Sequence, residues 1–218
     1  MDKTEPVQTE ADTTRQRILE AAGEVFAQQG FHRATVREIC AKAGANVAAV
    51  NYHFGDKERL YAQVLRYAHM CAIVKHPHGL GVAADAPPQE RIHAFVKSML
   101  HRLLDEGRPA WQGKLMSREM AEPTAALDLI VEEQIRPNFT FVFKAVSEIL
   151  GPGATPEQIR PCVASIVGQC LFYFFGRAVF ERLNPDLKLG PHMIDSIAAH
   201  ITSFTLAGLR ERAKEIAR

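Results

Sequence analysis

Three polar side chains of different chemistry stand together at Asn51, Tyr52 and His53, at the end of the stretch AKAGANVAAVNYHFGDKERL (residues 41–60). Lys57 follows a few residues later. Side chains of these types can donate hydrogen bonds to the phosphate oxygens of a nucleic acid, contacts that position a protein without reading the base sequence. The chain contains no nucleophile elbow, P-loop or HExxH pattern. We therefore expect a binding surface rather than an active site, with no cofactor and no metal.

Two short helices must hold these donors in place. Thr35 and Glu38 have the spacing of a capping box, and the helix that they open ends at Gly44. A second helix starts at Asn46 as N-cap and ends at Gly55. Two packed helices joined by a sharp turn at a glycine are typical of a helix-turn-helix unit.

Helical periodicity dominates the whole chain, and no strand-like alternation of useful length occurs. The fold class is therefore predicted to be all-α. We expect a disordered tail over residues 1–12, a helix-turn-helix domain over 13–66 and a larger helical domain over 67–218, with a loop at 76–89. Thr13 and Gln16 are expected to cap the first helix, and one helix is expected to run from about Glu157 to Leu183.

The charge balance limits the size of any nucleic-acid surface. The 218 residues carry a formal net charge of +1, and residues 12–66 hold eight Lys and Arg against six Asp and Glu, a local net of +2. Such a surface binds modestly per subunit, which favours a dimer. The N-terminus lacks the apolar core of a secretory signal, and the apolar run at 162–175 is shorter than a membrane span. We expect a cytoplasmic protein with no membrane partner.

The run RILEAAGEVFAQQGFHRATVREICAKAGANVAAVNYHFGDKERLYAQVL resembles the N-terminal domain of TetR-family transcriptional regulators over roughly residues 15–65. Asn51 stands where that family usually has tyrosine. This substitution within NVAAVNYHFG, together with SREMAEPTAALDLI, resembles the CecR subgroup of the family. The resemblance implies a homodimeric repressor that binds a palindromic double-stranded DNA operator and holds a small-molecule effector in its C-terminal helices. The identity of the effector does not transfer.

The predicted DNA-binding residues fall into two kinds. Small Ala48 and Ala49 let the second helix approach base edges in the major groove, whereas the polar side chains bind phosphates. The full predicted set is Thr35, Arg37, Asn46, Ala48, Ala49, Asn51, Tyr52, His53 and Lys57.

Two copies are predicted to pair through the last two long helices, because the helix after residue 156 is apolar on nearly every side. Ala164 and Gly168, four residues apart, allow close approach of helices. The predicted interface consists of Ala164, Gly168, Phe172, Phe175, Ile194, Ile197, Ile201 and Phe204.

The effector site is predicted around Pro137, which interrupts a helix from Leu127 to Leu150. Gln134 and Asn138 place two amides on a stripe where apolar residues are expected. These amides either line a mostly apolar pocket or satisfy the broken helical ladder, and the sequence leaves both open. The predicted lining is Trp111, Met116, Arg118, Gln134, Asn138, Phe139, Phe143, Gln169 and Phe174. Arg118 has a second candidate role as an ion-pair partner of Glu122.

Two other classes of protein remain as alternatives. A structural DNA binder without ligand control would share the first domain, but it would not need so large an apolar C-terminal part. A helical enzyme is the other alternative, although no catalytic pattern supports it. Cys71, His76 and His78 match no zinc-ligand spacing and are expected to belong to a solvated linker.

Overall fold

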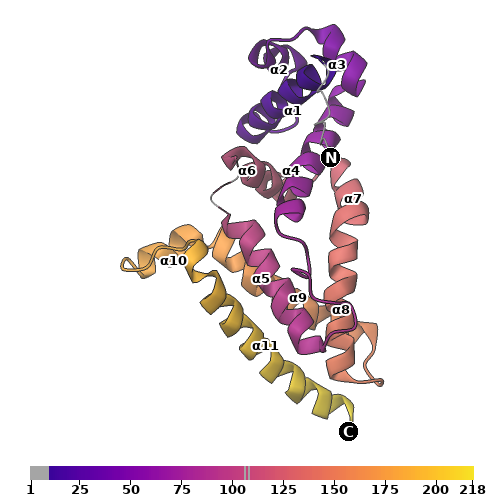
Figure 1. The fold of residues 1–218 in the computed structure, drawn as a ribbon, viewed down its shortest axis with the longest axis vertical. Helices are drawn as coiled ribbons and strands as arrows, with labels where there is room; N and C mark the ends of the chain where they lie inside the picture. The colour runs from indigo at the N-terminus through magenta and orange to yellow at the C-terminus, as the bar shows by residue number, and fades with distance from the viewer. Residues whose placement is uncertain (1–9, 106, 108) are drawn as a thin grey trace, which may run out of the picture. The chain divides into compact units, whose positions relative to one another are not determined.

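The computed structural model describes residues 10–105, 107 and 109–218, and this part of the chain contains helices and no strand. The predicted all-α class is therefore confirmed. In chain order the elements are α1 (Glu10–Gln29), α2 (Val36–Ala43), α3 (Val47–Phe54), α4 (Lys57–Lys75), α5 (Pro88–Leu104), α6 (Ala110–Ala121), α7 (Ala126–Ile130), a π-helical segment (Val131–Ile135), α8 (Arg136–Leu150), α9 (Pro156–Phe175), α10 (Arg177–Leu183), a 3-10 turn (Pro191–Met193) and α11 (Ile194–Ile216) (Figure 1).

The chain divides into two compact units. Of the described residues, unit 1 comprises those up to Met70 and from Pro109 to Val131, and unit 2 comprises those from Cys71 up to residue 107 and from Glu132 to Arg218. In unit 1, α1 packs against α2, α3 and α6. Its core includes Phe26, whose ring meets the ring of Tyr61 edge-on at 4.8 Å between centroids.

Unit 1 extends beyond the predicted 13–66 segment because α6 packs onto α1. Trp111 occupies the space above Gly23, where an added Cβ would lie 2.5 Å from the indole ring. The hydroxyl of Tyr61 donates to Glu119 Oε2 at 2.7 Å, and both of these side chains are buried. A glycine and a buried polar pair therefore fix α6 to unit 1, and neither is visible as a pattern in the sequence.

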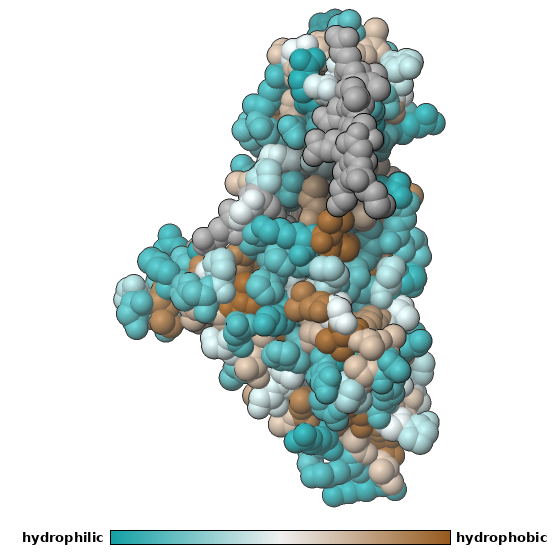
Figure 2. Space-filling view, in the orientation of Figure 1, coloured by the Kyte–Doolittle hydropathy of each residue, from teal (hydrophilic) through white to brown (hydrophobic). Residues whose placement is uncertain are grey.

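Unit 2 is built on α5, α8, α9 and α11, which pack against one another. Figure 1 shows α11 running along α5, with α10 and the loop that follows it projecting from the rest of the unit. The core is mainly aliphatic and includes Ile92, Leu100, Val142, Val163 and Ile201, all nearly fully buried. On the face of unit 2 seen in Figure 2, apolar residues are separated by hydrophilic ones.

The first helix starts earlier than its capping pattern predicts. Helix α1 begins at Glu10, so Thr13 lies inside the helix and the expected Thr13–Gln16 box is not its start. The amide of Gln16 instead donates to Glu20 Oε1 and to the hydroxyl of Tyr67, each at 2.8 Å. Residues 10–12 of the expected tail are therefore helical, and residues 1–9 lie outside the described residues.

The helix expected from Glu157 to Leu183 is two helices, α9 and α10, which meet at Gly176 with a bend of 71°. A Cβ on Gly176 would lie 2.7 Å from the carbonyl oxygen of Phe172, so the bend requires glycine there. No single helix in the described part of the chain is long and apolar enough to cross a membrane. Only α9 and α10 taken together meet that test.

The interruption predicted at Pro137 begins before the proline. The backbone adopts a π-helical segment over Val131–Ile135 and returns to α-helix at Arg136, with Pro137 in the first turn of α8. Proline has no N–H to donate to the preceding helical turn, and the π-helical segment lies in that turn. The π-helical segment therefore moves the irregularity upstream and leaves α8 regular.

Candidate functional site

Capping residues fix the ends of α2 and α3. The backbone N–H of Glu38 donates to Thr35 Oγ1 at 3.3 Å, and Glu38 Oε2 accepts from the N–H of Thr35 at 3.0 Å. The Thr35 hydroxyl, which donates to Glu38 Oε2 at 2.7 Å, and then the Thr35 N–H hold the pKa of Glu38 below its usual value. Asn46 Oδ1 accepts from the N–H of Ala49 at 2.8 Å, which caps α3. Both predicted caps are confirmed.

The turn between the two helices needs a residue in the left-handed region. Gly44 has φ +59° and ψ +41°, and its N–H bonds to the carbonyl of Cys40. Few side chains accept this conformation without strain. The predicted role of Gly44 is therefore confirmed, and Asp56 likewise caps α4 through a 2.7 Å bond from the N–H of Arg59 to Asp56 Oδ1.

One face of α3 is buried and the other is open. Val50 and Phe54 are buried in unit 1, whereas Ala48, Asn51 and Tyr52 are exposed. Tyr52 is 83% exposed, and its ring stands edge-on to that of His53 at 4.9 Å. The open face therefore offers hydrogen-bond donors at its C-terminal end and small side chains at its start. The predicted Arg37 is also exposed, in the first turn of α2.

Lys57 has contacts that the sequence did not reveal. Its Nζ lies 4.6 Å from the centroid of the Phe31 ring and 3.4 Å from the carbonyl oxygen of His32. The side chain thus ties the α1–α2 connection to the start of α4. Phosphate binding by Lys57 stays a prediction, and it would compete with these contacts.

Val47, in the first turn of α3, was not predicted as a binding residue, yet it is 44% exposed. Its spacing from Val50 and Phe54 is that of a core stripe, so no sequence signal separates it from buried residues. An exposed branched side chain beside Ala48 could contact a thymine methyl group in the major groove.

The predicted effector residues are divided between the two units. Trp111, Met116 and Arg118 belong to unit 1, whereas the other six belong to unit 2. Trp111 is packed over Gly23. Arg118 Nη1 donates to the carbonyl of Gln28 at 3.2 Å, and Arg118 Nε lies 3.9 Å from Glu122. The predicted ion pair of Arg118 with Glu122 is thus confirmed, although the two groups are far apart for an ion pair.

Gln134 and Asn138 lie one turn apart at the junction of the π-helical segment and α8. Asn138 Nδ2 donates to the carbonyl oxygen of Gln134 at 2.7 Å, so one amide does serve the irregular helix. Gln134 is only 4% exposed, and both polar atoms of its side chain lack a hydrogen-bond partner, as does Asn138 Oδ1. The rings of Phe139 and Phe143 lie 5.7 Å apart on α8.

The remaining two predicted effector residues lie on α9. Gln169 Nε2 donates to the carbonyl of Ser165 at 3.2 Å and to Thr205 Oγ1 at 3.4 Å. Phe174 packs beside Phe175, with 5.1 Å between ring centroids. The amide nitrogen of Gln169 is therefore already bonded to α9 and α11.

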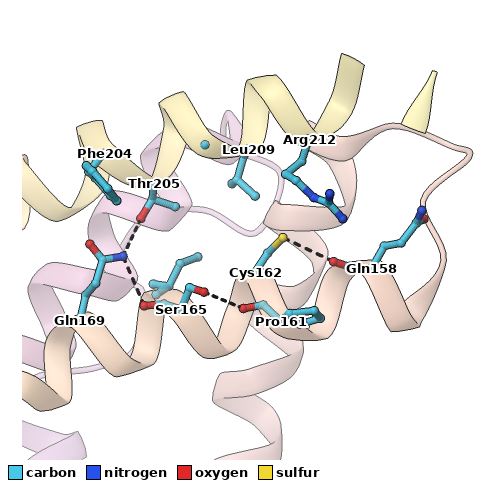
Figure 3. Close-up of a pocket in the computed structure, with 11 residues that line it drawn as sticks. Gln158, Pro161, Cys162, Ser165, Gln169, Phe204, Thr205, Leu209 and Arg212 are labelled. Carbon is cyan, nitrogen blue, oxygen red and sulfur yellow. Dashed lines mark hydrogen bonds between the residues drawn. The ribbon is translucent and has the colours of Figure 1, made fainter. Parts of the chain in front are cut away.

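A groove of about 430 Å³ runs between α9 and α11 (Figure 3). Figure 3 shows its polar side chains turned to partners in the protein: Gln169 to Ser165 and Thr205, and Ser165 Oγ to the carbonyl of Pro161. Cys162 Sγ similarly contacts the carbonyl of Gln158 at 3.4 Å. The rest of the wall includes Ile166, Phe204, Gly208 and Leu209.

The predicted dimer residues separate by burial. Ala164, Gly168, Phe172, Phe175 and Phe204 are exposed. Ile194, Ile197 and Ile201 are instead buried in the core of unit 2, because the stripe they form faces α5 and α8 within the same chain. These three isoleucines are therefore removed from the candidate interface.

The loop after α4 is anchored rather than simply solvated. Arg102 Nη1 donates to the carbonyl of His76 at 3.1 Å, to His78 Nδ1 at 3.0 Å and to Ser98 Oγ at 2.8 Å. Burial lowers the pKa of Arg102 to about 10 and, with the nearby guanidinium, the pKa of His78 to about 4. Within the described residues, no three His, Cys, Asp or Glu side chains are grouped to hold a metal ion.

Comparison with known proteins decides the family. Residues 18–64 match the family of bacterial regulatory proteins of the tetR type, and residues 88–209 match the C-terminal domain of the HTH-type transcriptional dual regulator CecR. The chain is a TetR-family regulator with a CecR-type C-terminal domain. Transcription regulation and DNA binding follow from this membership, and members of the family are regulators rather than enzymes.

Individual relatives agree with this assignment. CecR of Shigella flexneri is 27% identical over 76% of this chain and 78% of its own length. The regulator UidR of Escherichia coli K12 is 32% identical over 55% of this chain and 59% of its own length.

Solved structures share the fold. A transcriptional regulator from Pseudomonas aeruginosa PAO1 aligns with a TM-score of 0.67 at 20% identity, covering 94% of this chain and 96% of that one. AibR, solved with isovaleryl coenzyme A and operator DNA, aligns with a TM-score of 0.63 at 18% identity, covering 88% and 97%.

Proposed function

We propose that this TetR-family regulator is a homodimeric repressor that binds a palindromic operator and is released from it by a small, largely apolar effector. The open face of α3 carries this proposal, because it presents donors and small side chains on a helix whose ends are fixed by caps. The fold of AibR, which was solved with both a ligand and operator DNA, accommodates both kinds of partner.

Recognition of DNA divides between the two ends of α3. Tyr52 and His53 bind phosphates, which sets the register of the helix in the major groove. Val47, Ala48 and Ala49 meet base edges, where methyl groups contact thymine. In a dimer the two α3 helices lie about one DNA turn apart, ~34–36 Å, and therefore select an inverted repeat.

Dimerisation is proposed through the exposed stripes of α9 and α11. On α9 this stripe includes Ala164, Gly168 and Phe172, and on α11 it includes Phe204 and Gly208. Among the described residues, and apart from the backbone of its own helix, nothing lies within 4 Å of a Cβ built on either glycine, so each leaves room for a facing helix. Two copies would form a four-helix bundle with a self-complementary interface, the commonest symmetry of oligomers.

The effector is proposed to bind unit 2 beside Gln134 and Asn138. It acts by binding more tightly to the conformation with low DNA affinity than to the DNA-bound one, since a ligand shifts an equilibrium only by its differential affinity. The predicted participation of Phe139 and Phe143 fits a mostly apolar site with few polar groups.

The experiment that tests DNA recognition is selection of bound fragments from random DNA with the full-length protein, followed by His53→Ala. We expect an inverted repeat, and we expect His53→Ala to weaken binding by about tenfold for all selected sequences alike, because it removes one bond to a charged phosphate. His192→Ala, an exposed histidine of unit 2, is the matched control. Unchanged affinity of His53→Ala would remove the phosphate contact from the proposal, and a set of fragments with no shared motif would indicate a structural DNA binder.

A further inference from the structure

The side-chain amide of Gln134 is the clearest unsatisfied polar group of unit 2. The residue is 4% exposed, and neither Oε1 nor Nε2 has a hydrogen-bond partner. Asn138 Oδ1, one turn later, is also buried and unpartnered, although its Nδ2 is bonded to the Gln134 carbonyl. Buried polar groups normally find a partner, and leaving one unsatisfied costs free energy.

The three unsatisfied atoms define a hydrogen-bonding pattern. The NH₂ group of Asn138 is the one that can donate to the carbonyl of Gln134, so the free atom of this amide must be its oxygen. Gln134 supplies one oxygen and one NH₂ group in either orientation of its amide. The site therefore offers two acceptor oxygens and the two N–H bonds of the Gln134 amide, so a ligand that satisfies the two oxygens must carry hydrogen-bond donors.

The neighbouring charge along the chain favours a neutral complement over an anion. The nearest guanidinium in the sequence, Arg136, is held by Glu132 through a bond from Nε to Oε2 at 2.6 Å and a second from Nη2 to Oε1, and both residues are exposed. A carboxylate beside two amide oxygens would face atoms that also carry negative partial charge, and burying it costs far more than burying a neutral group.

We infer that the effector is an uncharged molecule whose hydroxyl or N–H groups donate to Gln134 and Asn138, with its apolar part on the α8 surface that carries Phe139 and Phe143. This inference rests on the proposed function, since it names the chemical class of the proposed effector. The π-helical segment supports it, because such segments occur frequently at functional sites. Gln169 differs from Gln134, because its amide nitrogen is bonded within the chain to the Ser165 carbonyl and to Thr205.

The first test needs no ligand and compares Gln134→Leu with Gln169→Leu in the full-length protein. Leucine has a similar volume and no polar atoms. Replacing an unsatisfied buried amide should raise the midpoint of thermal unfolding by about 2–4 °C, as expected where function has retained a destabilising group. Replacing the bonded amide of Gln169 should lower the midpoint. A lower midpoint for Gln134→Leu would overturn the inference, because it would make this amide a structural group.

The second test measures binding of four naphthalene probes by calorimetry. We expect 2-naphthol, which donates an O–H, to bind about tenfold or more tightly than 2-methoxynaphthalene or naphthalene, which donate none. We expect no measurable binding of 2-naphthoate. In Gln134→Leu and Asn138→Leu, the preference for 2-naphthol should disappear.

Three outcomes of the probe test would overturn the inference: equal binding of 2-naphthol and its methyl ether, binding of 2-naphthoate as tight as that of 2-naphthol, or no binding of any probe. DNA binding by the parent protein, measured without probes, tests the proposed function separately. A parent that selects an operator but shows any of these three outcomes keeps its function as a DNA-binding regulator and loses the proposed effector class.

Discussion

Unit 2 holds two regions with glutamine amides on helices. The amide of one region is hydrogen-bonded within the chain, whereas the amide of the other is not. In the groove between α9 and α11, Gln169, Ser165 and Cys162 each have a partner within the chain. In the π-helical segment just before α8, Gln134 is more deeply buried, and its side-chain amide has no partner. A surface whose polar groups are already satisfied can be covered by another helix without loss of hydrogen bonds. Unsatisfied groups instead gain by meeting a ligand that brings its own polar atoms.

The largest expected effect comes from Gly168→Arg, which tests whether the groove face is covered by a second copy. The protomer has free space at Gly168, so the variant should fold, but a charged side chain cannot be accommodated against a partner helix. We expect the protein to sediment as a monomer at micromolar concentration, where the parent sediments as a dimer. Thr140→Arg, on an exposed position of α8, is the control and should stay dimeric.

If the parent protein were a monomer, no second copy would cover the groove between α9 and α11, and the contrast between a covered groove and a ligand site would fail. A dimeric Gly168→Arg would place the interface elsewhere on the molecule.

A smaller effect is expected at a third set of polar groups, around Arg102, where every bond is made within the chain. His78 has a pKa of about 4 in the folded protein, lowered by burial and by Arg102, against about 6.5 when unfolded. The unfolded chain therefore binds the proton more readily, and stability should fall as the pH decreases from about 6.5 toward 4. His78→Gln, which keeps an acceptor for Arg102, should make this decline shallower in urea unfolding series at several pH values. An unchanged slope would remove His78 from the acid-sensitive groups.

The local signals of the sequence predict the DNA-binding element well. Capping boxes, N-caps and a positive-φ glycine depend on residues a few positions apart, so the roles of Thr35, Gly44 and Asn46 follow from the sequence alone. Where the same local signal is weak, as at Thr13, the helix extends past it. The contacts of Lys57 with Phe31 are invisible in the sequence because they join residues distant along the chain.

The dimer and effector residues are predicted less well, for a physical reason. Periodicity shows that a stripe is apolar, but not which side of a four-helix core it faces. The pattern therefore places Ile194, Ile197 and Ile201 at the interface although they face the core of unit 2. The break at Gly176 and the packing of Trp111 on Gly23 depend on close steric contacts, which composition does not encode.

The most direct test of the proposed function is whether a pair of subunits binds DNA sequence-selectively. The full-length protein is titrated, at fixed salt, with a selected DNA fragment and with a scrambled fragment of equal length. The mass of each complex is then measured by sedimentation. We predict two chains on one inverted repeat, with affinity at least about 10³-fold above that for the scrambled fragment. Equal affinity for both fragments, or a single chain bound to the repeat, would contradict the proposal of a dimeric operator-binding regulator.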